Sequence, residues 1–453
     1  MSGNENEGNK RKIEPHKKDT KTDDKNKESN ETKDEKENCQ IQANNVIYFK
    51  IINNEKEFDD YQNMNLENSF QPTYTYELFT NEIIHGYRGL KILISLTPKT
   101  FYIHLKIKFS QKLAINDNIE EIFSKHFKDR YTTDKNIFIE ELKKEKDIKC
   151  PKGKLLYSEN NREIYNIDIL KDEFLVENYS IQILCSFFID AASFIPVETN
   201  FWGYFLIIEK KSNDNDWHTL GFCSYKNFHI QLDKYYTMLS QFLVLPPYQR
   251  KGIGSCLLEN IYKFLYQEDK SCLEVTTEDP DIEFILMRDY TICKIIMKEK
   301  FIDNLLKLFS GKTIENKDTY DKFNLEKKNI DEICKKIKLQ ENLITRAFEI
   351  IKYGLVANSK DTLALFEKDK KDSMVKMLSD SSFENINKKR YRGPFIFFHD
   401  EDFNYDYKKG LEEASALPSE KRMEMLYPEY IADIEKIVPK INSMILEYKN
   451  NLN

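Results

Sequence analysis

Two residue patterns meet in the segment Phe242-Leu243-Val244-Leu245-Pro246-Pro247-Tyr248-Gln249-Arg250-Lys251-Gly252-Ile253-Gly254. Its first four residues are apolar and typical of a buried strand, which the two prolines end because proline cannot donate to a sheet ladder. After the glycines, apolar residues recur on one face of a helix at Leu257, Leu258, Ile261, Phe264 and Leu265. The segment therefore predicts a strand, a glycine-containing loop and an amphipathic helix, in that order.

The loop between the strand and the helix has the features of an anion site. Glycines let the backbone approach a ligand, while the first N–H groups and the dipole of the helix attract negative charge. A pyrophosphate is the natural ligand, although the same loop also serves as an ordinary strand-to-helix turn. A P-loop is not predicted at Gly311-Lys312-Thr313, because that motif needs glycine where this chain has Leu306.

A second predicted strand, Cys272 to Thr277, leads into Glu278-Asp279-Pro280-Asp281 and another helix. Helix capping explains Asp279 as the N-cap, Pro280 as the first helical residue and Asp281 near the positive helix end. Capping does not explain Glu278. This acid is expected at the carboxyl end of the strand beside the glycine loop, the edge at which open α/β sheets bind ligands.

These residues resemble the GNAT superfamily of N-acetyltransferases, whose signature here is Gln249-x-x-Gly252-x-Gly254. The wider pattern resembles the type B histone acetyltransferase family. The segments that carry this resemblance are Leu243-x-Leu245-x-Pro247-Tyr248, Leu257-Leu258-Glu259, Glu278-Asp279-Pro280, Arg288-Asp289-Tyr290, Gly86-Tyr87-Arg88-Gly89-Leu90-Lys91-Ile92, Ala192-Ser193-Phe194-Ile195 and Trp202-x-Tyr204-Phe205-Leu206. It covers about residues 46 to 300 and fades in the C-terminal part.

The resemblance implies an α+β protein with the GNAT fold, a splayed mixed sheet flanked by helices. Residues 1–45 are highly charged and are expected to form a disordered tail. Strand-like runs predict an N-terminal mixed α/β domain on the substrate side over residues 46–150. The acetyl-CoA-binding catalytic domain is then expected over residues 151–292, and a C-terminal helical module over residues 293–453.

The resemblance also implies where acetyl-CoA binds. Its pantetheine is expected to pair with the strand residues Phe242, Leu243 and Val244. Its pyrophosphate is expected on the backbone N–H groups of Gln249, Arg250, Lys251, Gly252, Ile253, Gly254 and Ser255. Arg250, where some family members have glycine, and Lys251 add positive charge near the phosphates.

The expected reaction is direct attack by a lysine amine on the thioester. Lysine has a reference pKa of about 10.4, so a base must remove a proton at a cost of about 4 kcal/mol near neutral pH. Glu278 matches the family's general base. Asp279 either assists or caps the helix, and Asp190, where the family usually has Glu, is either catalytic or a solvent-facing polar residue. A backbone N–H near Leu243 is expected to hold the thioester oxygen.

Charge and resemblance together point to a basic protein substrate. The 453 residues include 69 basic and 76 acidic side chains, a net charge of −7 that argues against a general nucleic-acid binder. The resemblance implies the tail of newly made histone four as substrate, with Trp202, Phe228 and Glu82 lining its groove. It also implies a β-propeller (WD-repeat) histone chaperone that docks near the loop after Glu209. The charge balance predicts no direct nucleic-acid partner.

The remaining features limit the protein's class. The eight cysteines form no CxxC pair, which predicts reduced thiols and no metal site. No apolar run is long enough to span a membrane, and the polar N-terminus predicts no signal peptide. We expect a protein of the nucleus and cytoplasm. Two alternatives stay open: a GNAT acetyltransferase for another amine, and a histone-binding scaffold that has lost catalysis.

Overall fold

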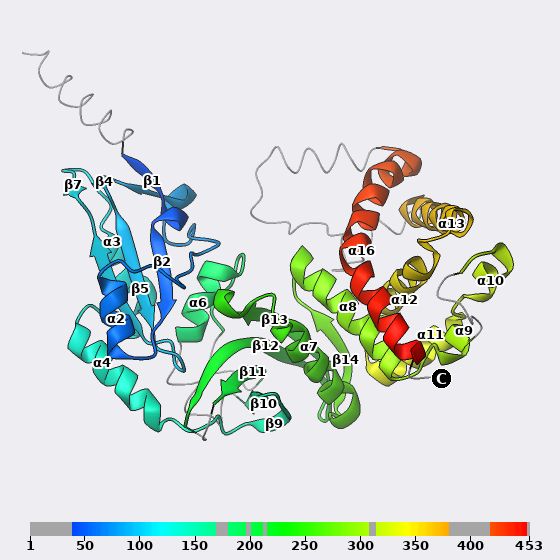
Figure 1. The fold of residues 1–453 in the computed structure, drawn as a ribbon, viewed down its shortest axis with the longest axis horizontal. Helices are drawn as coiled ribbons and strands as arrows, with labels where there is room; N and C mark the ends of the chain where they lie inside the picture. Colours follow the sequence, from blue (N-terminus) through cyan, green and yellow to red (C-terminus); the bar gives the residue numbers. More distant parts are fainter. Residues whose placement is uncertain are drawn as a thin grey trace, which may run out of the picture.

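The computed structural model describes residues 39–168, 180–195, 201–211, 215–307, 314–379 and 417–450. The charged segment 1–38 and the aromatic segment 391–407 lie outside the described residues. Figure 1 shows an N-terminal part, a central sheet and a group of C-terminal helices arranged side by side along the longest axis of the molecule.

The N-terminal part is built on a four-stranded mixed sheet in the order β2-β5-β6-β8. Its strands are β2 (Ile47–Ile51), β5 (Lys91–Leu96), β6 (Ile103–Lys108) and β8 (Tyr131–Thr132). Three helices pack around it, namely α2 (Glu55–Gln62), α3 (Ile119–Phe127) and α4 (Lys135–Lys144). Two small ribbons pair β1 (Gln40–Gln42) with β3 (Ile83–His85) and β4 (Tyr87–Arg88) with β7 (Gln111–Lys112). Short 3-10 turns are η1 (Ala43–Asn45), η2 (Thr80–Glu82) and η3 (Glu145–Asp147).

The ordered chain starts earlier than the sequence predicted. Residues 40–45, assigned above to the charged tail, form β1 and η1, and the side chain of Ala43 is fully buried. The backbone oxygen of Cys39 accepts a hydrogen bond from the Gly86 amide at 3.1 Å. Only one apolar residue, Ile41, lies in β1, so its alternating pattern is too short to be recognised from sequence.

The central sheet has six strands in the order β14-β13-β12-β11-β10-β9. They are β9 (Lys154–Glu159), β10 (Arg162–Asp168), β11 (Trp202–Lys210), β12 (Trp217–Gln231), β13 (Lys234–Val244) and β14 (Cys272–Thr277). All pairs are antiparallel except β13 with β14, which is parallel. This mixed sheet with flanking helices is the predicted GNAT architecture, and the overall class is α+β as expected.

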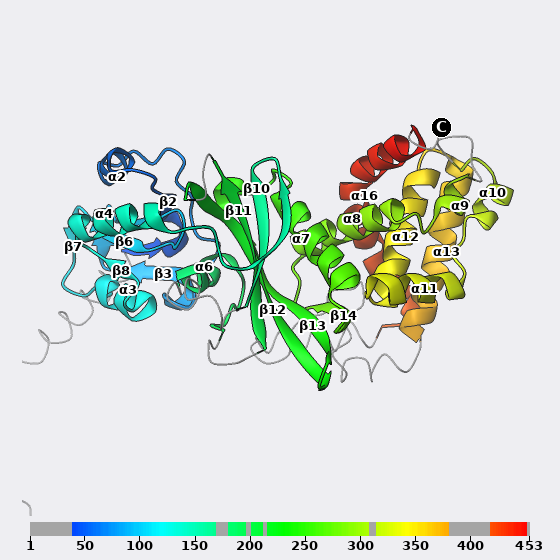
Figure 2. The same ribbon diagram turned by 90° about the horizontal axis from the view of Figure 1, so that it is seen from below.

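The two faces of the central sheet pack against different parts of the chain (Figure 2). Phe205 and Ile207 of β11 lie in one core with α7 (Ile253–Lys263) and α8 (Ile282–Lys298). Tyr204 and Leu206 alternate with them and lie in a second core with α6 (Ser180–Phe188) and the N-terminal sheet. Side chains of β11 alternate between the two faces of the sheet. The N-terminal part therefore packs on one face, and α7 packs on the other.

The C-terminal helices continue the core on one face of the central sheet. They are α9 (Asp303–Lys307), α10 (Lys317–Lys322), α11 (Lys327–Ile337), α12 (Glu341–Val356), α13 (Lys360–Ser379) and α16 (Ser419–Asn450). The boundary predicted between residues 292 and 293 is wrong, because it falls inside α8. Leu257 of α7, Ile344 of α12 and Ile441 of α16 belong to one buried cluster. The other predicted boundary, at residue 150, falls between η3 and β9.

Candidate active site

The glycine loop presents the start of α7 to open space. After β13 the chain passes through the 3-10 turn η4 (Pro246–Tyr248) and reaches Gly252, the N-cap of α7, with φ of +75°. Gly252 supplies no side-chain cap, and a Cβ added to it would meet no described atom within 4 Å. The first N–H groups of a helix have no intrahelical acceptor. The chain therefore offers backbone donors and a helix dipole to an anion here.

The two motif glycines have different roles. A Cβ on Gly254 would lie 2.7 Å from Sδ of Met287 and 3.6 Å from Cγ2 of Val244. Gly254 therefore allows α7 to pack closely against β13 and α8. The neighbouring Ile253 side chain is buried in the core, so this residue can offer a ligand only its backbone.

The charged residues of the loop are already engaged within the protein. The Arg250 guanidinium lies 2.8 Å from the Glu283 carboxylate, with both side chains exposed. Lys251 donates to the backbone oxygen of Pro247 at 2.9 Å, and Gln249 donates from its side-chain amide to the backbone oxygen of Val244 at 2.8 Å. Gln249 therefore ties the loop to β13.

Strand β13 has an open edge beyond Leu239. Its parallel pairing with β14 runs from Tyr235↔Cys272 to Leu239↔Thr277, and no described strand pairs with residues 240–244 on that side. On the other side, Leu245 donates to the Leu220 oxygen at 3.0 Å. Backbone groups alternate along a strand, so Leu243 also faces β12. The N–H groups of Phe242 and Val244, the neighbours of Leu243, then face the open edge, and an oxyanion donor near Leu243 stays a prediction.

Glu278 lies at the point where β13 and β14 separate. Its amide donates to the Leu239 oxygen at 2.8 Å, which is the last backbone bond between the two segments. Its carboxylate is exposed and accepts a 2.5 Å hydrogen bond from the Ser240 hydroxyl. The predicted base thus stands directly beside the open edge of β13.

The cap of α8 is Asp281, and the prediction that Asp279 is the N-cap is wrong. The Asp281 side chain accepts a hydrogen bond from the Phe284 amide at 2.7 Å. Asp279 lies outside the helix at φ of +37° with an exposed side chain. The helix therefore begins two residues later than the sequence predicted, and Asp281 serves as the cap in place of Asp279.

Asp190 is exposed at the end of α6 and is held by a tyrosine that sequence reasoning missed. The Tyr76 hydroxyl donates to its carboxylate at 2.6 Å and accepts from the Ala191 amide at 2.6 Å. Burial, followed by the hydrogen bond to Asp190, raises the pKa of Tyr76 to about 12. The contact joins residues 114 positions apart, so no local pattern signals it.

The charges of three carboxylates from separate segments act on Tyr74. Burial raises the pKa of its phenol, and the negative charges of Asp190, Asp281 and Glu82 raise it further. The Tyr74 ring packs edge-on against Tyr76 at 5.9 Å. The amides of Thr73 and Tyr74 both donate to the Phe187 oxygen of α6, which fixes this loop against the central part of the molecule. The result is an acidic, aromatic surface close to the start of α8.

Glu82 holds the loop that carries Tyr74 through hydrogen bonds. Its carboxylate accepts hydrogen bonds from the Thr75 amide at 2.8 Å, the Asn44 side chain at 3.2 Å and the Gln42 side chain at 3.4 Å. These bonds position the segment that carries Tyr74. Direct contact of Glu82 with a substrate stays a prediction.

Trp202 and Phe228 lie on either side of a lysine of the chain itself. Nζ of Lys226 is 5.5 Å from the Trp202 ring centroid and 4.9 Å from that of Phe228. Lys226 of β12 pairs with Met238 of β13, and Met238 lies two positions before Ser240 in the sequence. The aromatic pair therefore already contacts one cation, Lys226, near the point where β13 and β14 separate, and its contact with a substrate stays a prediction.

The described part of the chain was searched for metal-binding groups and for membrane-spanning helices, and neither was found. It contains no group of three or more His, Cys, Asp or Glu side chains arranged to hold a metal ion. Its helices include none with the length and hydropathy needed to cross a membrane.

Two family models match this chain. The model described as "Histone acetyl transferase HAT1 N-terminus" matches residues 39–190, and "Acetyltransferase (GNAT) family" matches residues 176–285. The type B histone acetyltransferase catalytic subunit of Candida albicans is 30% identical over 349 residues, which cover 69% of this chain and 80% of that protein. This chain belongs to the type B histone acetyltransferase catalytic subunit family.

The match to the human catalytic subunit of the same family is 31% identical over 246 residues. It covers 50% of this chain and 58% of the human protein, so the matched region spans little more than half of that relative. Among solved structures, an aminoglycoside acetyltransferase covers 27% of this chain at 16% identity and a TM-score of 0.21. The two family models overlap at residues 176–190, which include α6 and Asp190.

Proposed function

We propose that this protein transfers the acetyl group of acetyl-CoA to lysine side chains in the tail of newly made histone four. The position of Glu278 supports this most directly. Its carboxylate stands where β13 and β14 separate, beside free backbone groups of β13. Membership of the type B family supports the reaction class, and the acidic surface around Tyr74 supports a basic peptide substrate.

The chain has a site whose groups fit acetyl-CoA, which supplies the activated acetyl thioester. The open edge at Phe242 and Val244 offers backbone groups to the amides of a pantetheine arm. The start of α7, from Gly252 to Ser255, offers N–H groups and open space to a pyrophosphate. Arg250 adds less positive charge than the sequence suggested, because Glu283 partly neutralises it.

Glu278 acts as the base in the proposed reaction. It takes a proton from the lysine ammonium, directly or through water, and Ser240 orients its carboxylate. The neutral amine forms the new N–C bond and the C–S bond breaks. The nitrogen then gives its second proton to the departing sulfur or to water, so the products are the amide and coenzyme A. A backbone N–H of Phe242 or Val244 stabilises the negative charge that develops on the thioester oxygen.

The substrate groove is proposed to run along the acidic and aromatic surface. Asp190 and Asp281 attract a Lys- and Arg-rich tail, while Trp202 and Phe228 contact its cationic side chains. A β-propeller chaperone is proposed to dock near the loop after Glu209, and the protein is proposed to work in the nucleus and cytoplasm. Both proposals rest on family resemblance.

Coenzyme A release with a histone-four tail peptide tests this function. The wild-type chain should release coenzyme A, and Glu278→Gln should slow turnover by about 10²–10⁴-fold with little change in acetyl-CoA affinity. Glu274→Gln is the matched control, since Glu274 lies in β14 four residues before Glu278, but its carboxylate accepts a hydrogen bond from Gln340. Wild-type turnover in Glu278→Gln would remove Glu278 as the base.

Substrate class is decided by the same assay with other acceptors. Faster release with small amines or with peptides that offer only an N-terminal amine would assign the chain to another amine substrate. Acetyl-CoA binding without release from any acceptor would favour the scaffold alternative.

A further inference from the structure

The N-terminal segment 1–38, which lies outside the described residues, is joined to the chain beside the proposed substrate surface. The described chain starts at Cys39, one residue before β1, and β1 pairs with β3. Gln42 of β1 donates to the Glu82 carboxylate at 3.4 Å, and the same carboxylate holds the loop that carries Tyr74. The segment is therefore attached within a few residues of a group that supports this surface.

The surface near that attachment point is acidic and open to solvent. The charges that act on Tyr74 come from Asp190, Asp281 and Glu82, and all of them are negative. The side chains of Asp190 and Asp281 are exposed. Glu278, the proposed base, lies three residues before Asp281 and is exposed too. A cationic chain attracted to this surface is therefore brought close to the proposed base.

Positive charge is concentrated in one part of the N-terminal segment. Residues 9–21 contain six basic and two acidic side chains, whereas residues 22–38 contain four basic and seven acidic ones. Unlike charges attract within the screening distance of about 10 Å, and like charges repel. The acidic surface thus attracts residues 9–21 and repels residues 22–38. The lysines in the attracted part are Lys10, Lys12, Lys17, Lys18 and Lys21.

Chain length lets the basic part reach this surface. An extended chain spans at most about 3.3–3.6 Å per residue. Lys21 stands 18 residues before Cys39, so it can lie up to about 60 Å from that anchor. Lys36 stands three residues before Cys39 and stays within about 11 Å of it, beside β1. The tether also raises the local concentration of residues 9–21 to the millimolar range expected for linked partners.

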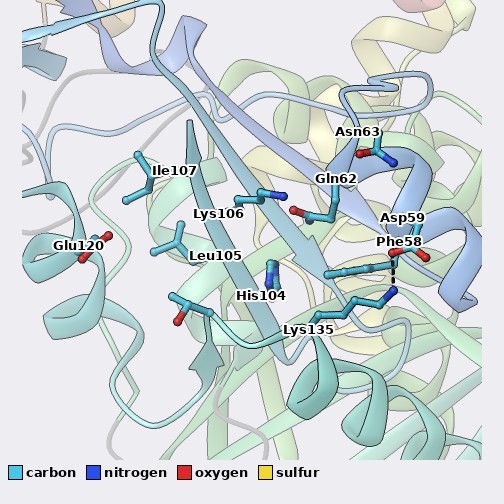
Figure 3. A pocket seen from close by; sticks show the side chains of 11 residues that line it. Phe58, Asp59, Gln62, Asn63, His104, Leu105, Lys106, Ile107, Glu120 and Lys135 are labelled. Atoms are coloured by element: carbon cyan, nitrogen blue, oxygen red, sulfur yellow. Dashed lines mark hydrogen bonds and ion pairs between the residues drawn. The ribbon is translucent and has the colours of Figure 1, made fainter. Parts of the chain in front are cut away.

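The cavity beside β6 and α2 offers no comparable attraction (Figure 3). It is lined by two acids and two bases, namely Asp59, Glu120, Lys106 and Lys135. A second cavity is lined by four lysines and two acids, namely Lys99, Lys146, Lys149, Lys211, Glu145 and Asp216. The first is balanced in charge and the second is basic, so the surface around Tyr74 is the better match for a cationic segment.

We propose that the protein acetylates its own N-terminal segment, at lysines within residues 9–21, by binding this segment within the same molecule on the acidic surface around Tyr74. Self-acetylation rests on the proposed acetyl transfer and adds a second substrate to it. The lysine ammonium gives one proton to Glu278, and its nitrogen bonds to the acetyl carbon as the C–S bond breaks. The second proton goes to the sulfur or to water, so each acetyl-CoA yields one acetyl-lysine and one coenzyme A.

Acetylation ends the attraction that led to it. An acetylated lysine has lost its positive charge, so the modified segment no longer binds the acidic surface. Each lysine reacts once, and steady turnover of a histone-four peptide should not depend on the segment.

The test incubates the full-length chain with acetyl-CoA and without peptide, and maps acetyl groups by mass spectrometry of proteolytic fragments. We expect acetylation within residues 9–21 and none at Lys36, with a rate constant unchanged by tenfold dilution of the protein. Glu278→Gln should slow it at least tenfold. A rate constant that falls on dilution would overturn the proposal in favour of transfer between molecules. Equal acetylation of Lys36, or an unchanged rate in Glu278→Gln, would assign the modification to uncatalysed chemistry.

A histone-four tail peptide assayed on the same preparation separates self-acetylation from the proposed function. Acetylated peptide together with an unmodified segment 9–21 would overturn self-acetylation alone. Failure to acetylate either substrate would overturn both.

A variant pair tests the binding surface. Asp190→Asn and Glu332→Gln each remove one exposed negative charge, the second from α11 among the C-terminal helices. Asp190→Asn should slow self-acetylation several-fold, and Glu332→Gln should leave its rate unchanged. Equal rates in the two variants would overturn the assignment of the segment to the surface around Tyr74.

Discussion

Single residues of one motif have separate roles in this protein. Gly252 and Gly254 belong to the same signature, yet Gly252 faces open space and Gly254 faces Met287 and β13. Glu278 and Asp279 are also adjacent, yet only Glu278 has its carboxylate bonded to Ser240 at the splay. The motif locates the site, and the backbone conformation at each position determines which residues face the ligand.

Gly252→Ala separates these roles. Its φ of +75° is unfavourable for alanine by about 1–2 kcal/mol, so a modest fall in thermal stability is expected. The added methyl group enters the space before α7, where the pyrophosphate is proposed to lie, and acetyl-CoA affinity should fall about tenfold by calorimetry. Unchanged affinity would show that the phosphates bind elsewhere.

Asp190→Asn tests whether this acid is catalytic or attracts substrate. The Tyr76 hydroxyl can still donate to the new side chain, so the loop should keep its position. We expect a several-fold higher KM for the histone-four peptide with kcat nearly unchanged, because charge attraction acts on binding. A fall in kcat comparable to that of Glu278→Gln would instead make Asp190 catalytic.

At the scale of elements, helix α8 joins the proposed site to the C-terminal helices. It begins at the Asp281 cap beside Glu278, and it carries Asp289, which is 1% exposed and bonds to Arg346 of α12 at 2.6 Å. Arg346 is 4% exposed and also lies over the Tyr430 ring of α16. One buried ion pair therefore fixes α8, α12 and α16 relative to each other.

Breaking that ion pair should destabilise the whole protein. Removing one partner leaves a buried charge uncompensated, so Arg346→Met should cost about 3–5 kcal/mol in urea unfolding. The double variant Arg346→Met with Asp289→Leu should recover much of this loss. The exposed pair Arg250–Glu283 is the control, since Glu283→Gln should change stability by less than about 1 kcal/mol.

The sequence predicted strands and helices best where the pattern of apolar residues ends at a proline or a glycine. The strand at 272–277 has the predicted bounds, and Pro246 and Gly252 delimited the loop before α7. Strand β12 runs on to Gln231 through the polar residues Lys226 and Asn227, which belong to the strand because they pair with β13 in a hairpin. Tyr74, Tyr76 and the shared core of α8 depend on contacts between distant segments, which no local pattern contains.

At the scale of the whole molecule, we expect the two parts of the N-terminal segment to contribute differently to stability and to substrate binding. Residues 40–45 form β1 and η1, and Asn44 bonds to the Glu82 carboxylate that supports the Tyr74 loop. Deletion of residues 1–38 should leave turnover intact, whereas deletion of residues 1–45 should lower thermal stability and raise the KM for peptide. Equal behaviour of the two truncations would show that β1 and η1 are dispensable.

Stability should fall on mild acidification. Burial lowers the pKa of both His104 and His126 to about 4, from 6.5. The unfolded chain takes up these protons below pH 6.5 and the folded chain does not, so stability is lost as pH falls from 6.5 towards 4. The slope is about 1.4 kcal/mol per pH unit for each histidine.

Urea unfolding at pH 7 and pH 5 measures this slope. His126→Gln, which can still bond to the Ser186 hydroxyl, should reduce it, and the exposed His229→Gln should not. An equal loss of stability in all three proteins would place the acid sensitivity in other groups.

The uncovered edge of β13 affects the protein's resistance to aggregation as well as its proposed ligand binding. An unpaired strand edge invites other chains to add to it, which is a route to aggregation. A ligand that binds only the folded state along this edge shields it and shifts the folding equilibrium by mass action. On the proposal that acetyl-CoA is that ligand, a shortage of the acetyl donor should lower the amount of intact protein as well as the overall rate of acetylation.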